Sequence, residues 1–186
     1  MFARIALFAV GLLLSAAAYA QQTPRATSPA PGAAKDALNQ EDKRFVQEAA
    51  AGGMAEVELS KIAQKSENPD IKRFADRMVQ DHMAANQELM SVTGGLGIEA
   101  PKALDHEHEQ MLQKLATLHG KALDDQYMKV MVQDHNKTVK LFQQEERSGG
   151  NTQLKSFAEK ALPILKEHQT MATEIARKAK QQASVR

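Results

Sequence analysis

The sequence predicts an all-α protein, in which four long helices form a bundle and a short helix lies in the crossover connection. Two observations predict this class. The chain of 186 residues is dominated by good helix formers such as Ala, Leu, Lys, Glu, Gln and Met, and aromatic residues make up only 4%. From Asn39 onward, apolar residues recur with a helical period in segments separated by glycine and proline. This length suffices for one domain with its own core.

Residues 1–20 are predicted to be a secretory signal peptide. Arg4 precedes an apolar run from Ile5 to Leu14, and the segment ends with small residues at Ala18 and Ala20. The apolar run is short for a membrane span, so we favour a cleaved signal over an N-terminal anchor and expect no transmembrane span in the mature protein. The chain has no cysteine, which excludes disulfides and lipid attachment through an N-terminal cysteine.

Residues 21–38 are predicted to be a disordered linker, because they are rich in Pro, Ala, Ser and Thr and show no helical period. The charges of the chain balance. It has 24 basic and 23 acidic residues, and Arg4 lies in the predicted signal peptide, so the mature protein is formally neutral. A nucleic-acid partner is therefore not expected, since such proteins present a basic face.

Residues 39–183 are predicted to form the helical domain. Its breaks are Asn68-Pro69, the glycines of 94–97 followed by Pro101, Gly120, and Gly149-Gly150. The segments between them are roughly 40–66, 70–93, 102–118, 122–148 and 152–181. The third is short and lies where a long crossover would be needed. Four long helices with a helical crossover favour a ferritin-like bundle over a simple up-and-down one.

The pentapeptide MVQDH occurs twice, at 78–82 and 131–135, and places histidines at matching points of two segments. At about 100° per residue, His82 and His168 fall within the apolar stripes of their helices, and Glu56 falls within that of the first. In the fourth segment His135 and Asp134 lie on opposite edges of the stripe, so Asp134 is an alternative to His135. Each long helix thus directs one metal-capable side chain inward: Glu56, His82, His135 and His168.

These four side chains are also expected at similar depths in the bundle. In each hairpin, the two residues differ in their distance from the connecting loop by roughly 6 Å, at a rise of 1.5 Å per residue. Imidazole and carboxylate together suit one transition metal ion, which could be Zn, Cu, Fe, Ni or Mn. The other hypothesis is a buried hydrogen-bond network without metal that holds the helices in register.

Four motifs, in this order, resemble the exported bacterial proteins of domain-of-unknown-function family 4142. They are FVQEAAAGGMAEVEL at 45–59, FADRMVQDH at 74–82, DQYMKVMVQDH at 125–135 and LPILKEH at 162–168. The resemblance covers about residues 40–180. It implies a ferritin-like bundle, often labelled "predicted outer membrane protein", and no established activity. We expect a periplasmic location instead, because the ten-residue alternating strands of membrane barrels are missing from the sequence.

Di-iron members of the ferritin-like class carry a lone Glu on each of two helices and Glu-x-x-His on the other two. Glu56 resembles a lone Glu, and His82 and His168 resemble the histidines of Glu-x-x-His. The positions three residues earlier are Val79 and Leu165, however, so the bridging carboxylates are missing. This departure argues against ferroxidase or oxygenase chemistry.

We therefore expect a periplasmic stress- or envelope-associated binding protein, whose inner layer holds one metal ion or a structural network. The alternatives are a metal-dependent oxidoreductase of ferritin-like type and a periplasmic helper that binds other proteins. No nucleophile–base pair, phosphate loop or cofactor motif supports an ordinary enzyme. The alternating His and Glu residues at 106–109 are interpreted as a solvated face, and Met78 and Met131 as core packing.

Overall fold

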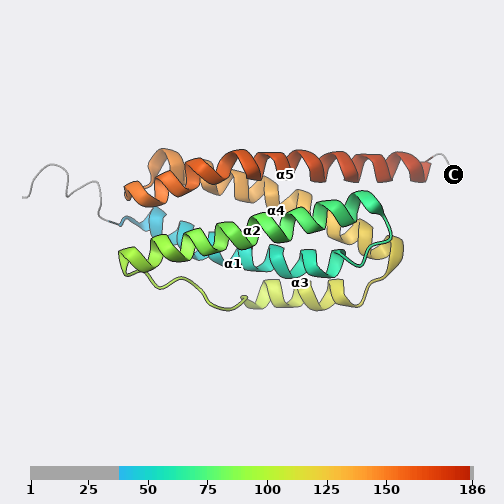
Figure 1. Ribbon diagram of the computed structural model, residues 1–186, viewed down its shortest axis with the longest axis horizontal. Coiled ribbons are helices and arrows are strands. Elements are labelled where there is room, and N and C mark those ends of the chain that lie inside the picture. Colours follow the sequence, from blue (N-terminus) through green and yellow to red (C-terminus); the bar gives the residue numbers. More distant parts are fainter. Residues whose placement is uncertain (1–37, 185–186) are drawn as a thin grey trace, which may run out of the picture.

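The computed structural model describes residues 38–184, and within that range every element is an α-helix (Figure 1). The predicted all-α bundle with a helical crossover is confirmed. The predicted signal peptide over 1–20, and the predicted linker over 21–38 except its last residue, lie outside the described residues. The helices are α1 Gln40–Ala63, α2 Pro69–Leu96, α3 His106–Ala116, α4 Gly120–Ser148 and α5 Thr152–Ser184.

Polar side chains cap the first three helices and fix where they begin. Asn39 and Asp42 form a capping box at the start of α1, and Asn68 caps α2 directly before Pro69. The third helix begins at His106 rather than near 102, because Asp105 accepts from the amide of His108 and serves as its cap.

The second helix runs past its predicted end at residue 93. Gly94 and Gly95 are helical, and the helix ends at Gly97, whose φ of 67° lies in the left-handed region that glycine adopts without steric cost. Only the last glycine of the 94–97 group therefore acts as a break. The predicted first helix, in contrast, is too long, since α1 ends at Ala63 and not at residue 66.

The four long helices stand at the corners of a bundle. The packed neighbours are α1 with α2, α4 with α5, α1 with α4, and α2 with α5, and the short α3 packs on α1 and α4. After α2 the chain returns along the length of the bundle through a loop and α3 before α4 begins, as Figure 1 shows. None of the helices in the described part of the chain is long and apolar enough to cross a membrane.

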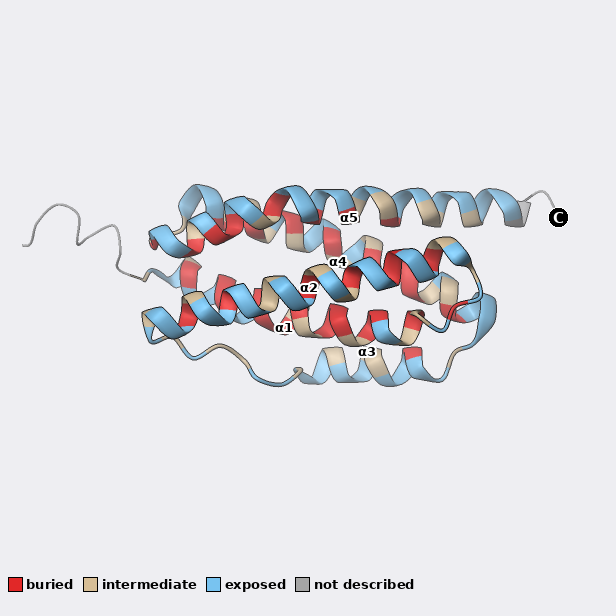
Figure 2. Cartoon of the chain, in the orientation of Figure 1, coloured by how far each residue is buried: buried red, intermediate tan, exposed pale blue. Residues whose placement is uncertain are grey.

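The buried residues lie on the sides of the long helices that face one another (Figure 2), and they form two apolar clusters. One cluster contains Phe45, Phe142 and Phe157, and we call it the Phe45 cluster. The other contains Phe74, Met78, Tyr127 and Met131, and we call it the Tyr127 cluster. Every long helix contributes to both clusters. On each long helix, one buried polar residue separates the residues that belong to the first cluster from those that belong to the second. These polar residues are Glu56, His82, His135 and His168.

Candidate metal centre

The four inward-facing residues predicted from the sequence meet in one buried layer. His135 and His168 are fully buried, and Glu56 and His82 are exposed by only 3% and 5%. The ring centre of His82 lies 5.7 Å from that of His135 and 5.3 Å from that of His168. The His135 and His168 ring centres are 5.4 Å apart. The three imidazoles therefore form a nearly equilateral triangle, with one corner on each of α2, α4 and α5.

The helical repeat explains why the histidines reach this layer. His82 follows Met78, and His135 follows Met131, by four residues, which places each histidine on the same helix face as a fully buried methionine. His168 follows buried Leu165 by three residues in the same way.

One nitrogen of each ring is held by an oxygen. His135 Nδ1 donates to the backbone carbonyl of Met131 at 3.0 Å. His168 Nε2 lies 2.9 Å from Asp81 Oδ2, and His82 Nδ1 lies 3.1 Å from Glu56 Oε2. A carbonyl can only accept, so the proton of neutral His135 is on Nδ1 and its Nε2 carries a lone pair. An ionised Asp81 fixes His168 in the opposite tautomer, with the lone pair on Nδ1.

The other nitrogen of each ring has no such partner. Nε2 of His82, Nε2 of His135 and Nδ1 of His168 are buried and have no hydrogen-bond partner among the described residues. One ring nitrogen of each histidine lies within 4.8 Å of those of the other two. Metal-binding histidines usually hold their second nitrogen against a carboxylate or a carbonyl, which fixes the ring and its tautomer, and this is the arrangement seen here.

The environment keeps these rings neutral. Burial lowers the pKa of His82 well below its ordinary value, and the neighbouring His135 and His168 lower it further. Burial and His168 lower the pKa of His135 to about 4. Burial also lowers the pKa of His168, although Asp81 opposes this shift. At neutral pH all three are imidazoles, the form that binds metal ions.

Glu56 approaches the nitrogens of His82 and His135 that are not among the three unpartnered ones. Its Oε2 faces Nδ1 of His82, and its Oε1 is 3.4 Å from Nδ1 of His135 without forming a hydrogen bond. The structure therefore brings Glu56 to the layer as a residue that orients the histidines, whereas the group with ligand spacing consists of the three histidines. Burial, followed by the charge of Asp134, raises the pKa of Glu56 well above its ordinary value.

The sequence left open whether Asp134 or His135 points inward. His135 is the buried one, and Asp134 is partly exposed and lines a cavity beside the layer. Asp81 directly precedes His82, just as Asp134 directly precedes His135. Asp81 does not line the cavity, however, and contacts His168. The pattern within one helix cannot reveal this contact, because it depends on how α2 and α5 pack.

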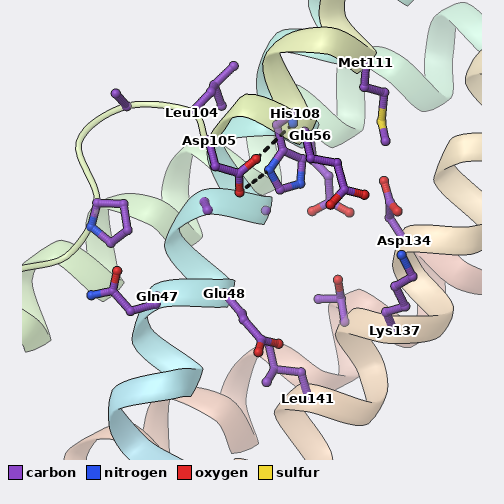
Figure 3. A pocket seen from close by; sticks show the side chains of 16 residues that line it. Gln47, Glu48, Glu56, Leu104, Asp105, His108, Met111, Asp134, Lys137 and Leu141 are labelled. Carbon is purple, nitrogen blue, oxygen red and sulfur yellow. Dashed lines mark hydrogen bonds and ion pairs between the residues drawn. The ribbon is translucent and has the colours of Figure 1, made fainter.

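A cavity of about 460 Å³ lies beside the layer, between α1, the segment 101–111 and α4 (Figure 3). Figure 3 shows Asp134 and Lys137 on α4 around this space, together with His108, whose Nδ1 is 2.9 Å from Asp105 Oδ2. In the His/Glu run at 106–109, residues 106, 107 and 109 are exposed as predicted, but His108 is partly buried and lines the cavity. His108 faces the cavity because of the way α3 packs on α1 and α4, which the sequence of α3 alone does not determine.

The donor set fits one transition metal ion. Ligand nitrogens at 2.0–2.1 Å from a zinc ion are roughly 3.4 Å apart, so nitrogens within 4.8 Å of one another need to approach by at most about 1.4 Å. Neutral imidazoles suit Zn, Cu, Fe and Ni. No carboxylate belongs to the three-residue group found in the described part of the chain, which suits a mononuclear site better than a bridged pair of ions.

Comparison with protein families identifies the family of this chain. The family model described as "Domain of unknown function (DUF4142)" matches residues 27–175. The chain belongs to this family. The DUF4142 match confirms the family resemblance predicted from the four motifs, whereas export and the periplasmic location stay predictions. No curated protein matches the chain.

Among solved structures, this DUF4142 chain is similar to one titled "Crystal structure of DUF305 fragment from Deinococcus radiodurans". The TM-score is 0.65 and the sequence identity 15%, and the similarity covers 75% of this chain and 98% of the other. At this identity the likeness concerns the fold alone. It adds a second family of unknown function that shares this helical bundle.

Proposed function

We propose that this DUF4142 protein is an exported binding protein that holds one transition metal ion between His82, His135 and His168. Two observations carry the proposal: each of the three buried histidines has a ring nitrogen without a hydrogen-bond partner, and one ring nitrogen of each lies within 4.8 Å of those of the other two. Asp81, Glu56 and the Met131 carbonyl orient the rings. A bound ion would supply the missing partner of all three nitrogens at once.

A structural network explains these nitrogens less well. In a buried network each donor meets an acceptor, because an unsatisfied buried polar group costs about 1–3 kcal/mol. Here one nitrogen of each ring is paired with an oxygen and the other is left without a partner. Helix register alone would require only the paired contacts. The unpartnered nitrogens therefore favour metal binding.

The space around the layer favours holding an ion over redox catalysis on an organic substrate. The cavity that reaches His82 measures about 40 Å³, which is close to the volume of one water molecule. Its walls include Leu89, Phe142 and Phe157. The larger cavity of about 460 Å³ is lined by none of the three histidines, so a substrate held there would not contact the ion. We therefore favour a binding protein of the cell envelope over a ferritin-like oxidoreductase.

The test is the metal content of the purified protein. We expect about one transition metal ion per chain, measured by elemental analysis after purification without an affinity tag. The variant His82→Ala/His168→Ala should lose it. The control His106→Ala/His119→Ala removes two exposed histidines and should retain it. Circular dichroism would show that both variants remain helical.

Absence of metal in the natural protein, even after incubation with Zn²⁺, Cu²⁺, Ni²⁺ and Fe²⁺, would contradict the proposal. Equal loss in the control variant would show that surface histidines bind the ion. Export is tested separately by fractionating cells that carry the full chain or a chain without residues 2–20. The full chain should appear in the periplasmic fraction, and the truncated chain should stay in the cytoplasm.

A further inference from the structure

The cavity beside the histidine layer carries an excess of acidic side chains. Five acidic side chains line it, including Glu56 with its raised pKa, and they face a single lysine, Lys137. A concave surface lined by one sign of charge concentrates ions of the opposite sign and accelerates their binding. The acidic residues are Glu48, Glu56, Asp105, Glu107 and Asp134.

Glu56 connects this cavity with the histidine layer. It is 97% buried, its Oε1 has no hydrogen-bond partner, and it lines the large cavity. It also lines the small cavity of about 40 Å³ that reaches His82. Gly52, one turn before Glu56 on α1, lines both cavities as well. Glu48, Thr138 and Leu141 also line both cavities, so the two spaces are neighbours along this side of α1 and α4.

We propose that the acidic cavity is the route by which the metal ion reaches the histidines: a divalent cation binds first between Asp134 and Glu56 and then passes to His82. This proposal rests on the proposed function, since it describes how the same site is loaded. His108 also lines this cavity, and its Nδ1 lies 2.9 Å from Asp105 Oδ2.

The first test compares loading rates. Co²⁺ is added to the metal-stripped full-length protein at low ionic strength, and its visible absorption is followed by stopped flow. Asp134→Asn should load about tenfold more slowly, because it removes a carboxylate from the route. The control Asp125→Asn removes an exposed aspartate from the same helix and should load at the natural rate. The final cobalt content and spectrum should be the same in all three proteins.

The second test narrows the route without changing charge. A Cβ atom at Gly52 would meet no atom within 4 Å, so Gly52→Phe can be accommodated at its backbone while its ring occupies the junction of the cavities. Both loading and chelator-induced release should slow about equally, and the equilibrium affinity should be unchanged. Gly94→Phe is the control, since its Cβ is equally unobstructed and Gly94 lies on exposed α2 surface away from both cavities.

The outcomes separate this inference from the proposed function. A natural protein that binds no cobalt would overturn both. Normal binding, with the same loading rate in Asp134→Asn and Asp125→Asn, would overturn the access route alone. A changed cobalt spectrum or a reduced content in Asp134→Asn would also overturn it, because Asp134 would then be a ligand of the final site.

Discussion

At the scale of single residues, the centre depends on how three histidines are oriented by three different oxygens. His135 uses a backbone carbonyl of its own helix, His82 uses buried Glu56, and His168 uses partly exposed Asp81. Asp81 is itself held by Arg77, whose Nε lies 3.1 Å from the same oxygen. Arg77 also pairs with Glu167, the residue before His168. These contacts fix the position of the Asp81 carboxylate between α2 and α5.

We predict that Asp81→Asn weakens metal affinity about 10- to 100-fold without changing the stoichiometry. The neutral amide can still accept a hydrogen bond from His168 Nε2, but it makes the ring a less basic ligand. Affinity is measured by competition with a chelator of known strength. Asp76→Asn is the matched control, because Asp76 is exposed on the same helix and contacts only Gln64 among the interactions described. Equal affinities in the two variants would show that Asp81 does not position the ligand.

At the scale of elements, a buried carboxyl pair joins the start of α1 to the turn between α4 and α5. Asp42 Oδ1 accepts from the amides of Gly150 at 2.9 Å and Asn151 at 3.1 Å, while its other oxygen caps α1. Glu145, on the last turns of α4, is fully buried beside it. Burial, followed by the neighbouring Asp42 carboxylate, raises the pKa of Glu145 to about 8.

This shift predicts a pH dependence of stability. Between pH 4.5 and about 8 the folded protein keeps a proton on Glu145 that the unfolded chain releases. The free energy of unfolding therefore decreases as pH rises through this window. Glu145→Gln is neutral throughout and should flatten the decrease, as measured by urea unfolding from pH 5 to 9. The control Glu146→Gln changes an exposed neighbour and should keep the natural slope. A flattened slope in the control, or a natural slope in Glu145→Gln, would contradict the assignment.

At the scale of the whole molecule, the histidine layer is the place where the two hairpins meet. His82 belongs to the hairpin of α1 and α2, and His135 and His168 belong to that of α4 and α5. A metal ion held by all three rings would bind only the assembled bundle. Binding to the folded state alone shifts the folding equilibrium by mass action.

We therefore predict that a binding metal raises the free energy of unfolding by about 2.7 kcal/mol when its free concentration is 100 times its dissociation constant. Urea unfolding of the stripped and loaded proteins measures the difference. Mg²⁺ should give no shift, because it prefers oxygen ligands. His168→Ala should also give no shift with the transition metal. A stabilisation that persists in this variant would place the bound ion elsewhere.

In α1, α2 and α5 the helical repeat was sufficient to predict which side chain enters the layer, because that choice depends on a single helix. Which ring nitrogens Glu56 approaches could not be predicted, since this depends on the packing of α1 against both α2 and α4. The partnership of Asp81 with His168 likewise depends on the contact of α2 with α5. Asp134 and His135 are neighbours at the edges of one stripe, and only the position of α3 decides which of them faces a cavity.

The division of the core by one polar layer also restricts how the helices can move along one another. If a helix slid by one turn, about 5.4 Å, its histidine or Glu56 would enter the Phe45 or the Tyr127 cluster. A polar group among those apolar side chains would lose its partners, and an apolar residue would take its place in the layer. The polar layer therefore fixes the axial register of the four helices, with or without a bound ion.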